Sequence, residues 1–357
     1  MNNVKHIASN IHDYTLSFEA TLSFLSGILS ETDAVFIVDS EVFELYPEFS
    51  VLVDDPRLIL LHAIEENKTL AAAEKLFDRL IELKPTKKTK IISIGGGITQ
   101  DVSGFVASTF FRGLHWVYVP TTLLAQADSC MGSKTSLNYK SYKNILGTFY
   151  PPHSIFIATS FTNTLKEEDL YSGMGEIAKL HVMGGKEKLR LLQAKLPGVH
   201  SKDEATILEL TRSSLDIKWT YMADDEFDQG KRNMLNYGHC FGHAIETAVH
   251  YSIPHGQAVV IGMILANKLA SDKGAISVEL NNELNELFFA ILKSDYHQLK
   301  SIDNNEVINA MKQDKKRSGN GLPLIMLNNR FEFYKITDMT EDEATNALDF
   351  FKNTFCK

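Results

Sequence analysis

The sequence predicts an α/β domain over residues 1–165 and a mainly helical domain over residues 166–357. In the first part, short apolar segments alternate with helical patterns, which indicates a parallel sheet covered by helices on both faces. After about residue 165, long helical patterns follow one another with few strand candidates. A length of 357 residues fits two domains or one large one.

Short apolar segments of the first part are typical of buried parallel strands, because they are continuous and contain β-branched residues. They cover residues 34–39, 58–62, 90–94 and 115–119. Residues 69–83 show helical periodicity, with an apolar face made of Leu70, Ala73, Leu76, Phe77, Leu80 and Ile81. Further helical patterns cover residues 101–109, 203–223, 234–250 and 258–271.

The composition is that of an ordinary globular protein, with 44% hydrophobic and 23% charged residues. A net charge of −9 argues against nucleic acid or an anionic membrane as the main partner. No apolar segment approaches transmembrane length, and the N-terminus lacks the pattern of a secretory signal. The cysteines, Cys130, Cys240 and Cys356, show no paired spacing. We therefore expect a cytoplasmic protein.

Three histidines lie close together in the second part of the chain. His239 and His243 are four residues apart and share one face of the predicted helix, and His255 follows in the predicted loop. Imidazoles at this spacing can bind one divalent metal, to which Glu176 could add an oxygen, with Lys179 one turn further on. Three ligands and an open position are typical of a catalytic site. The alternative is that the histidines cap or fill a helix.

Gly95, Gly96 and Gly97 follow a predicted strand and precede a predicted helix. Glycines in this place let backbone N–H groups approach a pyrophosphate at the helix N-terminus. Asp39 ends an earlier strand, where its carboxylate could accept hydrogen bonds from ribose hydroxyls. Together they favour a dinucleotide site over a simple tight turn. Asp101 could belong to the site or cap the helix.

The segment Gly132-Ser-Lys-Thr135 is superficially similar to a phosphate-binding loop. The complete glycine-lysine spacing of that loop is absent, which excludes a nucleoside triphosphatase of that kind. Basic residues in glycine-rich or small-residue contexts remain candidate anion ligands, and the alternative for each is solvated surface. They are Lys134, Lys143, Lys179, Lys218 and Arg232.

A series of short motifs occurs in order along nearly the whole chain. They are Gly95-Gly-Gly-Ile-Thr-Gln-Asp101, Phe111-Arg-Gly113, Pro120-Thr-Thr-Leu-Leu-Ala-Gln-Ala-Asp128, Gly132-Ser-Lys-Thr135, Lys143-Asn-Ile-Leu-Gly147, Ser172-Gly-Met-Gly-Glu-Ile-Ala-Lys179, Arg232-Asn-Met-Leu-Asn-Tyr-Gly-His239, Phe241-Gly-His-Ala-Ile-Glu246 and His255-Gly-Gln-Ala-Val259. Through these motifs together, the chain resembles the 3-dehydroquinate synthase family, the sugar phosphate cyclases.

The resemblance implies a Rossmann-like N-terminal domain that binds NAD and a helical C-terminal domain that holds one divalent metal. Zinc is the expected metal and cobalt the alternative. The ligands would be Glu176, His239 and His255, and His243 would face the substrate. Helical spacing alone pairs His239 with His243 instead. We follow the resemblance, because His255 begins a matching His-Gly-x-Ala-Val segment.

The resemblance also assigns the remaining site residues. Those around the substrate would be Asp128, Lys134, Asn144, Lys179, Lys218, Arg232, Asn236 and one of Lys315 or Lys316. Arg112 would reach the phosphate group across the interface of a homodimer. Those lining NAD would be Asp39, Glu65, Lys68, Gly96, Gly97, Asp101, Thr121, Thr122 and Lys143.

The implied activity is carbocycle formation from an anionic sugar phosphate, 3-deoxy-D-arabino-heptulosonate 7-phosphate, in the shikimate pathway. Phosphate would leave during a sequence of transient NAD-dependent oxidation, elimination, reduction and intramolecular aldol closure, which is the work of a phosphorus-oxygen lyase. Alternatives are a sister cyclase such as 2-deoxy-scyllo-inosose synthase, a metal-dependent polyol dehydrogenase and a catalytically silent binding protein.

Several residues depart from the family's pattern. Ser133 and Ser136 stand where the family has Gly-Gly-Lys-Thr-Gly, and Gln257 stands where it has Glu. Gln100 and Ile64 replace glycines and Ala158 replaces Asp. Since Ser133 adds bulk beside Lys134, these departures bear on the choice of substrate more than on the chemistry.

Overall fold

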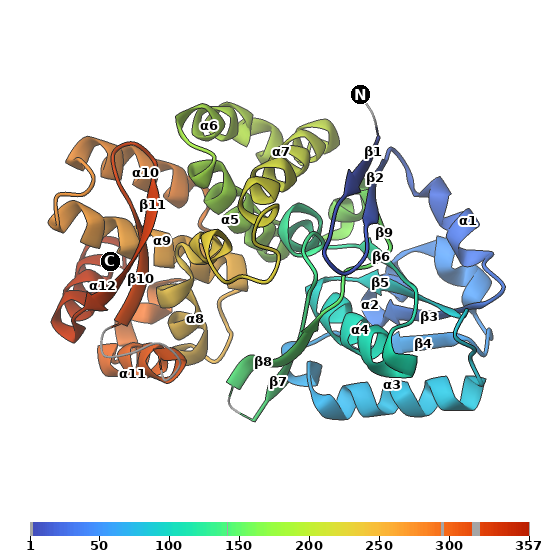
Figure 1. The fold of residues 1–357 in the computed structure, drawn as a ribbon. Helices are drawn as coiled ribbons and strands as arrows, with labels where there is room; N and C mark the ends of the chain where they lie inside the picture. Colours follow the sequence, from blue (N-terminus) through green and yellow to red (C-terminus); the bar gives the residue numbers. More distant parts are fainter. Residues whose placement is uncertain (1–2, 141, 294–295, 316–321, 357) are drawn as a thin grey trace. The chain divides into compact units, whose positions relative to one another are not determined.

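The computed structural model describes residues 3–140, 142–293, 296–315 and 322–356 (Figure 1). By its internal contacts the chain divides into two compact units, Met1–Leu165 and Lys166–Lys357. In the described residues, no helix is long and apolar enough to cross a membrane.

The first unit is built on a seven-stranded sheet in the order β1-β2-β9-β6-β5-β3-β4. Only β1 pairs in the antiparallel direction, and all other neighbours are parallel. The strands are β1 (Val4–Ile7), β2 (Tyr14–Glu19), β3 (Ala34–Asp39), β4 (Leu58–Leu61), β5 (Lys90–Gly95), β6 (Trp116–Pro120) and β9 (Ser154–Ala158). The parallel sheet that the sequence predicts is confirmed.

The helices of this unit are α1 (Leu25–Leu29), α2 (Ser40–Leu45), α3 (Leu70–Leu83) and α4 (Gly97–Thr109). Thr69 caps α3, since its hydroxyl accepts a hydrogen bond from the Ala72 amide. The buried stripe of α3 contains Ala73, Leu76 and Leu80, whereas Ile81 is 64% exposed. The apolar face of α3 is therefore narrower than its periodicity predicts.

The same unit also contains a two-stranded hairpin, separate from the seven-stranded sheet, that was not predicted. It consists of β7 (Lys134–Tyr139) and β8 (Tyr142–Phe149), and β7 packs against α4 (Figure 1). Its sequence is dense in small polar residues and lacks a continuous apolar run, so the hydrophobic pattern does not reveal it.

The second unit is mainly helical. Its helices are α5 (Glu167–Met183), α6 (Lys186–His200), α7 (Glu204–Met222), α8 (His239–Ala248), α9 (His255–Asp272), α10 (Val278–Ile291), α11 (Asn304–Lys315) and α12 (Glu341–Phe355). Of the 18 residues of α9, 14 are buried, so this helix forms the centre of the unit. A hairpin of β10 (Leu322–Leu327) and β11 (Phe333–Met339) is an addition that the sequence analysis missed.

The predicted helix over residues 234–250 is wrong at its beginning. A 3-10 turn, Lys231–Asn236, comes first, and Gly238 then has φ +80° before α8 begins. Such a backbone angle is readily adopted only by glycine, so it separates the two segments. His255 likewise lies at the first position of α9 and not in a loop.

Three histidine rings stack in the first unit. The ring of His153 lies 3.9 Å from those of both His12 and His115. Burial, together with the neighbouring histidines, lowers the pKa of His153 to about 3, and burial lowers the pKa of His115 as well. The folded protein therefore resists protonation at this stack.

We expect the protein to lose stability as the pH falls from about 6.5, the ordinary histidine value, towards 3. In this window the unfolded chain takes up protons that folded His153 and His115 do not, so acid favours unfolding. His153→Gln should flatten the decline in the urea midpoint between pH 7.5 and 5.0. His6→Gln, which alters an exposed histidine of β1, is the control and should leave the decline unchanged. An equally steep decline in His153→Gln would contradict this account.

Candidate functional site

Four side chains from three helices of the second unit converge. The Nε2 atoms of His239 and His255 lie 3.5 and 3.2 Å from Glu176 Oε1. His243 joins the two other histidines, and one ring nitrogen from each of the three lies within 4.8 Å of the others. Glu176 is only 1% exposed, so its carboxylate is removed from water. The structure thus brings together all the residues that the sequence pattern proposed for a metal.

Close contact between two helix backbones sets the position of Glu176 relative to His255. A Cβ atom placed on Gly175 would lie 2.1 Å from the carbonyl oxygen of Gly256. One placed on Gly256 would lie 1.8 Å from the carbonyl oxygen of Ser172. Only glycines allow α5 and α9 to approach this closely, and each glycine is the chain neighbour of a proposed ligand.

Hydrogen bonds donated by Nδ1 orient two of the imidazoles. His255 Nδ1 lies 3.1 Å from Glu246 Oε2, and His239 Nδ1 lies 3.2 Å from the carbonyl oxygen of Tyr237. When Nδ1 donates to these acceptors, Nε2 carries the lone pair and faces Glu176. Partners of this kind commonly fix metal-binding histidines. Glu246 was assigned no role in the sequence analysis, although it ends the motif Phe241-Gly-His-Ala-Ile-Glu246.

The donor set fits a divalent metal. One carboxylate and two imidazoles are a common ligand set for catalytic zinc. Burial disfavours the charged form of His255, but Glu246 and Glu176 outweigh it and raise its pKa to about 10. Burial and the nearby Lys179 hold the pKa of His239 well below its usual range. A cation bound at Nε2 of His255 would therefore displace a proton.

Buried basic residues belong to the same unit. Lys179, Lys218 and Arg232 are 2%, 6% and 5% exposed, which is rare for cationic side chains. Lys179 Nζ lies 2.5 Å from Glu176 Oε2, and the Arg232 guanidinium donates to the carbonyl oxygen of Glu226. Asn236 ends the 3-10 turn before α8 and is exposed. These positions would suit an anionic ligand.

The first unit carries the predicted dinucleotide residues at the carboxyl ends of its strands. Asp39 ends β3 and accepts a hydrogen bond from the Glu41 amide, and burial raises its pKa to about 6. Gly96 is the N-cap of α4, and no side chain caps that helix. A Cβ atom on Gly96 would lie 2.9 Å from the Thr122 methyl group. An uncapped helix N-terminus beside a closely packed glycine can bind a pyrophosphate.

Two further residues predicted to line NAD, Gly97 and Thr121, lie beside the start of α4. Gly97 is the first residue of α4, and the Thr121 amide, just after β6, donates to the carbonyl oxygen of Gly95. The turn that these glycines form is thus tied to the next strand of the sheet.

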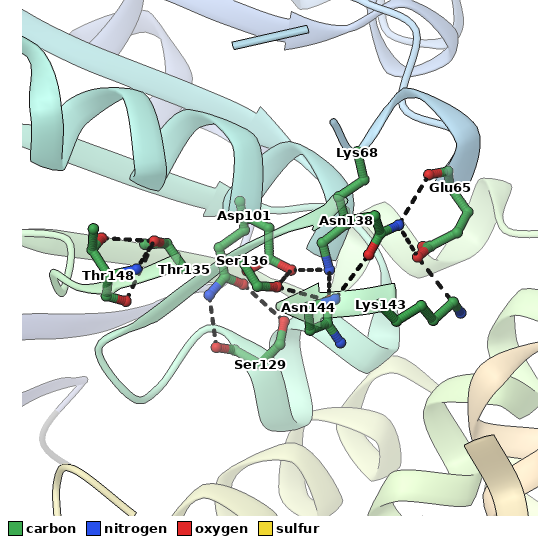
Figure 2. A network of polar contacts seen from close by, with 12 residues as sticks. Glu65, Lys68, Asp101, Ser129, Thr135, Ser136, Asn138, Lys143, Asn144 and Thr148 are labelled. Carbon is green, nitrogen blue, oxygen red and sulfur yellow. Dashed lines mark hydrogen bonds and ion pairs between the residues drawn. The ribbon is translucent and has the colours of Figure 1, made fainter. Parts of the chain in front are cut away.

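A polar network joins α4 to the β7–β8 hairpin (Figure 2). Lys68 Nζ lies 2.5 Å from Asp101 Oδ2 and 2.6 Å from Asn144 Oδ1. Asp101 lies in the second turn of α4, so it does not cap the helix, and that alternative is wrong. Burial raises the pKa of Asp101, although Lys68 opposes the shift.

The network continues on the other side of the hairpin. Asn138 Nδ2 donates to Glu65 Oε1 at 2.8 Å, and Lys143 Nζ lies 3.5 Å from the same oxygen (Figure 2). The structure therefore joins Glu65 and Lys143 to the group that contains Lys68. Asn138 is a further member that sequence reasoning missed.

Other predicted residues of the first unit lie in short helical turns or at the start of a strand. Asp128 lies in a single π-helical turn, Ala125–Ser129, and Lys134 is exposed at the first position of β7. Arg112 is exposed after α4 and has φ +67°. Among the contacts described for the chain, Arg112 joins neither group. Lys316 lies outside the described residues, as does the side chain of Lys315.

Two departures from the family's pattern have structural partners. Gln257 donates to the carbonyl oxygens of Tyr171 and Ile291 and accepts from the Lys293 amide, which ties α9 to α5 and to the end of α10. Gln100 donates to the Ser129 carbonyl oxygen and accepts from its hydroxyl.

Known proteins resemble both units. The model of the 3-dehydroquinate synthase N-terminal region matches residues 58–172, and that of its C-terminal region matches residues 173–317. The 3-dehydroquinate synthase of Clostridium tetani (strain Massachusetts / E88) is 35% identical over 298 residues, 82% of this chain and 79% of that protein.

Two solved structures share the fold. The 2-epi-5-epi-valiolone synthase of Streptomyces hygroscopicus subsp. jinggangensis 5008, with NAD+ and Zn2+ bound, has a TM-score of 0.85 at 21% identity. A 2-deoxy-scyllo-inosose synthase, complexed with carbaglucose-6-phosphate, NAD+ and Co2+, has a TM-score of 0.81 at 24% identity. Each match covers 97% of this chain and 99% of the other. Given both matched regions and the extent of its sequence identity, the chain belongs to the 3-dehydroquinate synthase family and is an enzyme of the sugar phosphate cyclase class.

Proposed function

We propose that this enzyme is a 3-dehydroquinate synthase that converts 3-deoxy-D-arabino-heptulosonate 7-phosphate into a carbocycle with loss of phosphate. The observation that carries the proposal is the convergence of Glu176, His239 and His255, with both imidazoles oriented through Nδ1. Such a site can bind a metal that in turn binds a hydroxyl group of the substrate. Family membership supports the same reaction.

Glu176, His239 and His255 would hold the metal, preferably zinc. A bound zinc ion would polarise the hydroxyl that is oxidised and so lower the barrier to hydride transfer. Glu246 would hold the Nδ1 proton of His255 once a cation has displaced the proton on Nε2. The Lys179 ammonium offsets the negative charge of the Glu176 carboxylate and so makes the net charge of the ligand cluster more positive.

In the first unit, Asp39, Gly96, Gly97, Thr121 and Thr122 would bind NAD, together with the polar network around Lys68. Asp39 would accept hydrogen bonds from the ribose hydroxyls, and the start of α4 would face the pyrophosphate. NAD supplies a hydride acceptor that is regenerated within each cycle.

The substrate's phosphate would be bound by cationic and amide side chains. Lys218 and Arg232 are buried, where a charge interacts more strongly with another charge than it does in water. Lys134 and Asn144 belong to the β7–β8 hairpin. These groups would stabilise the charge that develops as phosphate leaves. His243, Asn236 and Asp128 would complete the substrate site.

We also propose a homodimer in which Arg112 contributes to the site of its partner. Arg112 is exposed in this chain, and both it and the preceding Phe111 have a left-handed backbone, with φ +67° and +52°. Such strain in non-glycine residues often marks a functional position.

A sister cyclase acting on another sugar phosphate is the second candidate. Ser133 and Ser136 favour it, because both replace glycines of the family's pattern next to proposed substrate residues. Ser133 is 1% exposed, so its extra atoms occupy interior space beside Lys134.

The proposal is tested by phosphate release. With NAD and zinc, the enzyme should release inorganic phosphate from 3-deoxy-D-arabino-heptulosonate 7-phosphate. Lys134→Ala should retain NAD and metal and lose roughly 100-fold or more in turnover, as when a charge-stabilising donor is removed. Lys140→Ala, in an exposed lysine of the same hairpin, should behave as the unaltered enzyme. Release from a different sugar phosphate alone would assign the chain to the second candidate.

The metal ligands can be separated from their neighbour by mutation. His255→Ala should lose bound zinc and activity together, because it removes one of three ligands. His243→Ala should lose activity and keep the metal, whereas a ligand role for His243 would make both variants metal-free. Glu246→Gln should weaken metal affinity by about 10- to 100-fold. Metal content after dialysis, measured by mass spectrometry, decides among these outcomes.

NAD affinity should depend on the charge of Asp39. Because its pKa is raised to about 6, the carboxylate is protonated as the pH falls through that value, and the dissociation constant for NAD should rise. Asp39→Asn, which can still cap α2, should bind NAD about 10- to 100-fold more weakly at pH 7.5 and lose this pH dependence. Glu44→Gln, at an exposed residue of α2, serves as the control and should leave NAD binding and its pH dependence unchanged, and calorimetric titration is the measurement. Unchanged binding in Asp39→Asn would remove Asp39 from the cofactor site.

A further inference from the structure

Ser136 lies on β7 at a position where the family's pattern has glycine. Its hydroxyl oxygen lies 3.0 Å from Asp101 Oδ2 and 2.9 Å from Asn144 Oδ1 (Figure 2). The side chain therefore adds a contact between a residue proposed to line NAD and one proposed to contact the substrate. A glycine at this position has no atom that could make the contact.

Lys68 contacts the same two oxygen atoms from its own position on the chain. Its Nζ lies 2.5 Å from Asp101 Oδ2 and 2.6 Å from Asn144 Oδ1. An ammonium group has three hydrogens and can donate to both oxygens, whereas the Ser136 hydroxyl donates to one at a time. The amide oxygen of Asn144 therefore accepts from Lys68, and it also accepts from Ser136 when the Ser136 hydroxyl donates to it and not to Asp101.

The backbone of Asn144 is fixed as well. Its N–H donates to Asn138 Oδ1 at 2.9 Å, and its φ of +52° lies in the left-handed region, which asparagine tolerates better than most residues. With the backbone held and the amide oxygen bound, rotation of the side-chain amide would break the contacts with Lys68 and Ser136. The Nδ2 group is then the part of the amide left to face a ligand.

We propose that Ser136 is a positioning residue that, with Lys68, directs the amide nitrogen of Asn144 towards an acceptor oxygen of the sugar phosphate. The inference rests on the proposed function, in which Asn144 contacts the substrate. The site thereby presents a hydrogen-bond donor at this point and not an acceptor. An anionic or hydroxyl oxygen of the substrate is the group that such a donor recognises.

The kinetic test compares Ser136→Ala with a matched control. Removing the hydroxyl should raise KM for the sugar phosphate about 3- to 10-fold, the range for one lost hydrogen bond, with the dissociation constant for NAD within about twofold. Ser136→Thr, which keeps a hydroxyl, should restore KM. Thr148→Val removes another hydroxyl that joins the hairpin to α4, through Ser108, and should leave KM unchanged. An equal rise in KM for Thr148→Val would reduce the effect to general hairpin stability and overturn the proposal.

A double-mutant cycle tests the route through Asn144. In an Asn144→Ala background, Ser136→Ala should cause no further rise in KM, because the group that it positions is gone. Additive effects of the two substitutions would overturn the proposal.

The orientation of Asn144 can also be measured without turnover. In spectra of 15N-labelled protein, the Asn144 side-chain amide signals, assigned by their loss in Asn144→Asp, should shift in Ser136→Ala and stay in place in Thr148→Val. Unshifted signals would overturn the positioning role whichever sugar phosphate is the substrate. If the signals shift in Ser136→Ala but the unaltered enzyme does not turn over 3-deoxy-D-arabino-heptulosonate 7-phosphate, the proposed function is rejected and the positioning role stands.

Discussion

The close contact between α5 and α9 is the constraint on which the second unit's site depends. Gly175 and Gly256 bring the two backbones so near that a single added methyl group would collide with a carbonyl oxygen. Because each glycine precedes or follows a proposed ligand, the contact sets where Glu176 and His255 stand. Gly262 extends the same principle to α8, since a Cβ atom there would lie 1.9 Å from the Gly238 carbonyl oxygen. Backbone packing therefore orders the site before any ligand binds.

The first unit achieves order in a different way. Its candidate residues are joined by charged hydrogen bonds, in which Lys68 occupies the central position between Asp101 and Asn144. Hydrogen bonds of this kind are short and directional, so they fix side chains on a hairpin that has little apolar core of its own. The two units thus use glycine packing and polar networks for the same purpose.

The sequence predicts those elements whose hydrophobic pattern is strong. The strand over residues 34–39 is found with the predicted bounds, because five of its six residues are buried and apolar. The β7–β8 hairpin escaped prediction, since its stability comes from polar contacts and packing on α4. The helix over 234–250 was predicted too long, because hydrophobic periodicity does not reveal a single residue with positive φ such as Gly238.

The candidate site could be predicted in its residue types better than in its geometry. The spacing of His239 and His243 indicated a cluster, and the structure places both near His255. The contributions of Glu246 and Tyr237 could not be read from spacing. Glu246 of α8 contacts His255, nine residues later at the start of α9, and Tyr237 contributes a backbone carbonyl group. The metal-binding and catalytic roles of these residues stay predictions.

Because Glu176, His239 and His255 lie on three different helices, a bound metal would affect the stability of the protein as well as its activity. A cation held by all three would act as a cross-link among α5, α8 and α9, and it would bind the folded chain in preference to the unfolded one. By mass action, each tenfold rise in free metal above the dissociation constant would then add about 1.4 kcal/mol to the free energy of unfolding. Scarcity of the ion would lower not only turnover but also the amount of enzyme that escapes proteolysis.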